Sequence, residues 1–71
     1  MKKTILLHNC AALGAFELRL IDGVWCIYHT LKKAVELIAQ SADYSVAFEI
    51  CKGAINRARL LHNARAKGVK N

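Results

Sequence analysis

The sequence predicts an α+β domain in which a small antiparallel sheet is packed by two C-terminal helices, with the strands preceding the helices. Three observations predict this fold class. An Asp-Gly pair separates two apolar runs within residues 16–29, an Ile- and Leu-rich segment precedes them, and the apolar positions after residue 30 recur with a helical period. Two strands with two or three helices are the alternative arrangement.

A third strand is expected over residues 4–8, which are rich in Ile and Leu and end beside the turn-forming Asn9. Because an isolated hairpin is only marginally stable in water, the sheet needs such a strand. A helix over residues 2–13 is the competing interpretation of the same segment.

The hairpin is expected over residues 16–29. Asp22 and Gly23 tolerate the positive φ that a two-residue type I′ turn requires. This turn pairs Ile21 with Val24 and gives the hairpin one core face, made of Phe16, Leu18, Leu20, Trp25 and Ile27. The opposite face mixes apolar and charged side chains: Glu17, Arg19, Ile21, Val24, Cys26 and Tyr28.

Two helices are expected after the hairpin, over about 31–40 and about 43–66. In the first, the apolar side chains fall within one arc of a helical wheel: Leu31, Ala34, Val35 and Ile38. Ser41, Asp43 and Ser45 then cluster, and these residue types favour helix N-caps over helix interiors. The second helix carries an apolar arc that includes Ala47, Cys51 and Ala54. Gly68 is expected to end it.

The 71 residues are expected to form one small globular domain, 1–71, with residues 67–71 as a frayed basic tail. The chain carries 11 Lys and Arg against 5 Asp and Glu, a formal net charge of +6, and no acid follows Glu49. This asymmetry predicts a basic surface for nucleic acid or for an acidic protein partner. Solubility of a small apolar protein is the simpler explanation of the same charge.

A cytoplasmic location is expected from the cysteines. Cys10, Cys26 and Cys51 are an odd number at wide spacing, which is untypical of a secreted disulfide framework. The Lys-Lys start followed by apolar residues resembles a secretory signal, but His8 ends that run after four residues. No stretch approaches the roughly 20 apolar residues of a membrane span, so no membrane association is expected.

No catalytic residues, metal site or cofactor are expected. His8, His29 and His62 accompany the three cysteines, but their spacings place no four ligands together. The sequence has no paired carboxylates, Gly-rich phosphate loop or nucleotide fingerprint. We therefore expect a binding protein rather than an enzyme.

Two binding hypotheses remain. The first is nucleic-acid binding through the polar side and flanks of the second helix: Lys52, Asn56, Arg57, Arg59, Asn63, Arg65 and Lys67. The alternative is a stoichiometric inhibitor or adaptor, of the small accessory or mobile-element type, that docks on a larger protein complex, whether or not that complex handles nucleic acid. It would dock through the mixed face of the hairpin: Arg19, Ile21, Val24 and Tyr28. A homodimer through the mixed face is compatible with either.

Overall fold

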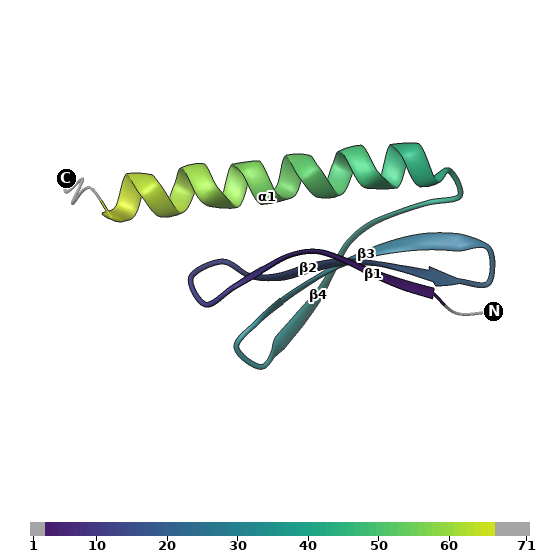
Figure 1. Ribbon diagram of the computed structural model, residues 1–71, viewed down its shortest axis with the longest axis horizontal. Helices are drawn as coiled ribbons and strands as arrows, with labels where there is room; N and C mark the ends of the chain where they lie inside the picture. The colour runs from purple at the N-terminus through teal and green to yellow at the C-terminus, as the bar shows by residue number, and fades with distance from the viewer. Residues whose placement is uncertain (1–2, 67–71) are drawn as a thin grey trace.

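The computed structural model describes residues 3–66, which form a four-stranded antiparallel sheet and one long helix. The elements are β1 (Lys3–Cys10), β2 (Gly14–Ile21), β3 (Val24–Leu31), β4 (Ala34–Ser41) and α1 (Tyr44–Ala66). The strands are neighbours in the order β1-β2-β3-β4, and α1 lies along one face of the sheet (Figure 1). The α+β class is therefore confirmed, in a β-β-β-β-α order.

The hairpin of β2 and β3 has the expected register. Ile21 pairs with Val24, and Leu18 pairs with Ile27. Asp22 has φ of 50° and Gly23 has φ of 78°, as a type I′ turn requires at its two central residues. The two strands extend a little beyond the expected range, from Gly14 to Leu31.

The helix expected over residues 31–40 is wrong, because this segment forms β4 at the far edge of the sheet. Lys32 takes a positive φ of 59° in the two-residue turn that joins β3 to β4. The register then shifts by one residue, since Ile27 pairs with Ala39 and Tyr28 pairs with Leu37. This bulge at Ile38 breaks the two-residue alternation that identifies a strand, and the segment's Ala, Leu, Glu and Lys residues favour helices.

The strand expected over residues 4–8, the third strand of the predicted sheet, is too short. β1 runs from Lys3 to Cys10 and pairs with β2 along its length. A second bulge interrupts this pairing, because Leu6 lies opposite Glu17 while His8 lies opposite Phe16. Both edge strands of the sheet thus carry a bulge, a common feature of sheet edges.

A single helix, rather than two, completes the described residues. Asp43 caps α1, since its Oδ1 accepts a hydrogen bond from the backbone N–H of Ser45 at 2.8 Å. The Oγ of Ser41 in turn accepts the N–H of Asp43 at 3.1 Å. The expected stop at Gly68 and the expected frayed tail over 67–71 lie outside the described residues.

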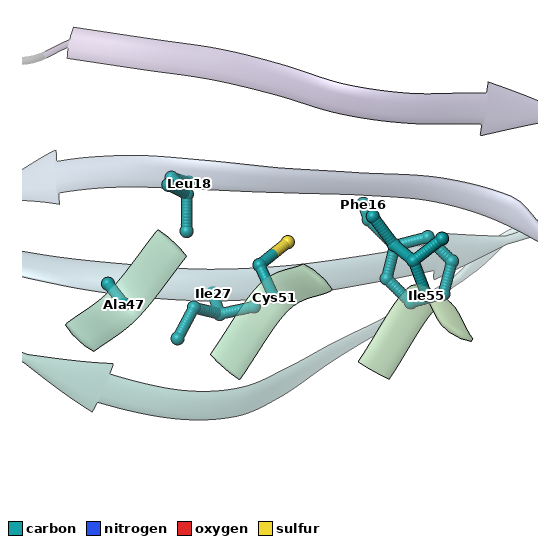
Figure 2. Packing of buried hydrophobic residues seen from close by; sticks show 6 residues of the cluster. All are labelled: Phe16, Leu18, Ile27, Ala47, Cys51 and Ile55. Carbon is teal, nitrogen blue, oxygen red and sulfur yellow. The ribbon is translucent and has the colours of Figure 1, made fainter. Parts of the chain in front are cut away.

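The core lies between α1 and the face of the sheet that carries Phe16. It consists of side chains from β2, β3 and α1 (Figure 2): Phe16, Leu18, Ile27, Ala47, Cys51 and Ile55. The three helical members recur every four residues and so form one stripe that faces the sheet. Trp25 lies only partly buried beside this core, where its ring meets that of Tyr44 edge-on at 4.9 Å.

Candidate nucleic-acid interface

The polar side of α1 is positioned by its buried stripe. Because Ala47, Cys51 and Ile55 face the sheet, the residues about 100° further around the helix lie along the border between α1 and β1. Lys52, Asn56 and Arg59 occupy this side at spacings of four and three residues, and all three side chains are exposed. The fold therefore aligns two cations and an amide along one line.

These three residues form one wall of an open groove of about 750 Å³ between α1 and β1. The helix also contributes Phe48, Glu49, Gly53 and Ile55. The opposite wall is the bulged part of β1: Leu6, Leu7 and His8. The groove is thus bordered by the edge of the sheet on one side and by a basic helix on the other.

The groove combines positive charge with aromatic and apolar surface. The Nζ of Lys52 lies 5.4 Å from the centre of the Phe48 ring, close enough for a cation–π contact. Lys52 and Arg59 outnumber the one carboxylate of the lining, Glu49. This combination provides partners for a negatively charged backbone and for planar apolar groups attached to it.

The other residues of the predicted basic set do not line this groove. Arg57 precedes Arg59 by two residues, which places it about 200° around the helix on the opposite flank. Arg65 lines a separate small cavity of about 170 Å³ near the β1–β2 turn, together with His29 and His62. Asn63 is exposed one turn beyond Arg59, and Lys67 lies outside the described residues. The predicted set is therefore divided between two flanks of α1.

The strand wall of the groove was not predictable from the helical pattern. A helical wheel shows which side of a helix is basic, but it does not show which strand lies next to that side. Leu6 and His8 become neighbours of α1 only through the sheet order and the bulge in β1. Phe48 precedes Lys52 by four residues, about one helical turn, and this spacing was the signal that the sequence offered.

The face of the sheet opposite α1 is open, and it brings together the residues of the alternative hypothesis. Arg19, Ile21, Val24 and Tyr28 all point to this face in the register of β2 and β3. The guanidinium of Arg19 lies 4.3 Å from the centre of the Tyr28 ring and pairs with the carboxylate of Glu17. The four side chains are half-buried, while Val35 and Leu37 of β4 are more exposed on the same face.

Two further features bear on the chemistry available to the described residues. Residues 3–66 hold no group of three or more His, Cys, Asp or Glu side chains arranged to bind a metal ion. Burial raises the pKa of the Cys51 thiol, which packs in the core between α1 and the sheet. This thiol is therefore held in its neutral, weakly nucleophilic form.

No protein-family model matches the sequence, and neither a curated protein nor a solved structure is significantly similar to the chain. Within the described residues, α1 is not apolar enough to cross a membrane. The geometry of the groove and of the open sheet face is therefore the basis for the functional argument.

Proposed function

We propose that this chain is a non-catalytic binding protein that holds single-stranded nucleic acid in the groove between α1 and β1. The observation that carries the proposal is the line of Lys52, Asn56 and Arg59 along one wall of that groove. We also propose a cytoplasmic location. The cysteines of the described residues, Cys10, Cys26 and Cys51, are free thiols, which fits a reducing compartment.

Single strands fit the site better than a duplex. A single strand offers both phosphates, which Lys52 and Arg59 neutralise, and unstacked bases, which bind to aromatic surface such as Phe48. A duplex keeps its bases stacked inside and offers the groove only phosphates. Asn56, between the two cations, supplies an amide that both donates and accepts hydrogen bonds.

The experiment is a fluorescence-anisotropy titration of the full chain with labelled single-stranded and duplex DNA and RNA, at about 50 and 200 mM salt. We expect tighter binding of single strands and a steep loss of affinity at the higher salt, because each neutralised phosphate releases counterions. Equal or tighter binding of duplex would contradict the groove as the site. Absence of binding at low salt would make the net charge of +6 a solubility feature.

The chain supplies a matched control for the position of the site. Arg59→Glu and Arg57→Glu make the same charge change on opposite flanks of α1, and both side chains are exposed. We expect Arg59→Glu to weaken binding at least about tenfold and to lower the salt slope by about one. Arg57→Glu should have a smaller effect, through long-range charge alone. Equal losses in the two variants would indicate a diffuse electrostatic attraction instead of a groove.

The second candidate function is that of a stoichiometric inhibitor or adaptor that docks on a larger protein complex. The gathering of Arg19, Ile21, Val24 and Tyr28 on the open sheet face supports it. Apolar groups rimmed by charge are typical of protein interfaces. Val24→Asp or Tyr28→Asp should then break a co-purifying complex while the circular dichroism spectrum is unchanged. If the complex survives both substitutions, the open sheet face is not the docking interface.

A further inference from the structure

The outer edge of β4 is an open pairing site. β4 is hydrogen-bonded only to β3 in the described sheet, so its other edge presents unpaired backbone N–H and C=O groups. Natural sheets commonly protect such an edge with Lys or Pro residues in the strand. β4 contains neither, and its exposed side chains include Val35 at 57%, Leu37 at 46% and Ile38 at 37%.

We propose that β4 pairs antiparallel with β4 of a second copy of this chain, joining two four-stranded sheets into one continuous sheet. A two-fold axis perpendicular to the sheet relates the copies, so the same edge serves both. Backbone hydrogen bonds of the edge would hold the pair together, as in other cases of strand addition. This inference concerns the edge of the sheet remote from β1 and does not depend on nucleic-acid binding.

The bulge in β4 selects the register of this pairing. Val35, Leu37 and Gln40 point to the open face, whereas Glu36, Ala39 and Ser41 point to the α1 side, because the alternation shifts at Ile38. Full overlap of Ala34–Ser41 with its own copy places Ala34 opposite Ser41, Val35 opposite Gln40 and Glu36 opposite Ala39. Each of these pairs keeps both members on the same face of the sheet, so the strand is complementary to itself.

A bulge normally discourages pairing at a sheet edge. In this register the two bulges meet at the two-fold axis, where Leu37 lies opposite Ile38 of the second copy. On each side of the axis, three residue pairs still have both members on the same face of the sheet. The exposed side chains of Leu37 and Ile38 would then lie at the centre of the interface.

Charges at the two ends of β4 favour the same arrangement. Lys32 and Lys33 precede the strand, and Asp43 follows it. An antiparallel copy brings the lysines before one β4 to the end of the other β4 that Asp43 follows, so opposite charges gather at both ends of the interface. A parallel copy would instead place the lysines together, and like charges at such positions are destabilising.

The symmetry leaves both proposed binding surfaces accessible. A two-fold axis perpendicular to the sheet keeps both α1 helices on the same side and both open faces on the other. Each β1 strand and its groove lie at an outer end of the joined sheet. The dimer would therefore carry two grooves, one at each end.

Sedimentation equilibrium of the full chain from about 1 to 500 μM tests the proposal, because edge interfaces are small and their affinities fall in the weaker range. We expect a reversible monomer–dimer equilibrium. Leu37→Lys should raise the dimer dissociation constant at least tenfold, since a lysine on an open edge opposes pairing. Leu60→Lys, at a position of α1 that is 63% exposed, is the matched control and should leave the equilibrium unchanged.

If the protein is a monomer throughout this concentration range, the proposal is overturned, and the open edge of β4 would then be available only to a strand of another protein. A dimer that is unaffected by Leu37→Lys would also overturn it, by placing the interface elsewhere. Cross-linking tests the register directly. A mixture of Ala34→Cys and Ser41→Cys chains should form a mixed disulfide dimer on mild oxidation, while Ala34→Cys alone should not exceed the wild-type background. The reverse pattern would contradict the antiparallel register.

Discussion

The imidazole of His29 stacks on the ring of Phe16, with the ring centres 4.2 Å apart and the planes 10° from parallel. The Nε2–H of the same imidazole donates a hydrogen bond to the carbonyl oxygen of Leu13 at 2.7 Å. His29 belongs to β3, Phe16 to β2, and Leu13 to the turn between β1 and β2. One side chain therefore ties the first turn of the sheet to its central strands.

Removing this imidazole should loosen the β1–β2 turn. We expect His29→Phe to lower the free energy of unfolding by about 1 kcal/mol, since it keeps a ring on Phe16 but loses the bond to Leu13. His29→Ala should lower it by about 2 kcal/mol, because the ring contact is lost as well. Urea denaturation followed by circular dichroism measures both. Equal effects of the two substitutions would show that the hydrogen bond, and not the stacking, matters.

Gly14 is required at the start of β2. It has φ of +87°, and a Cβ at this position would lie 2.2 Å from the backbone oxygen of Thr30. We expect Gly14→Ala to destabilise the fold by about 3 kcal/mol or more, through backbone strain together with the clash. Thermal unfolding of the variant measures this loss.

Gly23 is the matched control for Gly14. Its φ of +78° is equally unfavourable for alanine, but a Cβ there would meet no atom within 4 Å. Gly23→Ala should therefore cost only about 1 kcal/mol. Similar losses in the two variants would contradict the close approach of Gly14 to Thr30.

Ile27 lies at the centre of the core, fully buried between β2, β3 and α1. Ile27→Val should destabilise the protein by about 1 kcal/mol and Ile27→Ala by about 3 kcal/mol, since the second leaves the larger cavity. Val46→Ala, on the exposed side of α1, should change the stability by less than about 0.5 kcal/mol. Chemical denaturation distinguishes these three outcomes. If the substitutions of Ile27 left the stability unchanged, the core would have to lie elsewhere.

Because of the Cys51 thiol, the free energy of unfolding is expected to depend on pH in the alkaline range. Burial raises its pKa in the folded state, so the folded protein favours the neutral thiol more than the unfolded chain does. The stabilisation is fully present below the unfolded thiol pKa of about 8.5 and is lost as the pH rises above it towards the raised folded value.

We therefore expect the free energy of unfolding to fall more steeply above about pH 8.5 in the wild type than in Cys51→Ala. The comparison of slopes isolates Cys51, because every other ionisable group is present in both proteins. Urea denaturation at a series of pH values measures it. Parallel pH profiles would show that Cys51 is ionised as readily in the folded protein as in the unfolded chain.

The part of the fold that was predictable from the sequence is local. Asp22 and Gly23 determine a turn whose geometry fixes the register of both flanking strands, so the central hairpin followed from two residues. The helix from Tyr44 was similarly marked by Asp43 and by the spacing of Ala47 and Cys51. Each of these signals acts within a few residues of the chain.

The part that was not predictable depends on pairing across the sheet. The segment after Leu31 has the composition of a helix, and its turn contains Lys32 and Lys33 in place of the usual Gly or Asn. Its strand conformation comes from hydrogen bonds to β3, which override local preference. The groove shares this origin, since Leu6 and His8 reach α1 only after β1 has paired with β2.

The order of the elements has a consequence for the way the chain folds. Every strand pairs with its neighbour in the sequence, so the sheet requires only short loop closures, which are kinetically fast. The apolar face of that sheet, however, is covered by side chains between Ala47 and Ile55, in the final third of the chain. A sheet that forms before α1 docks therefore has its apolar face uncovered, and the docking of α1 is the folding step that protects this face from aggregation.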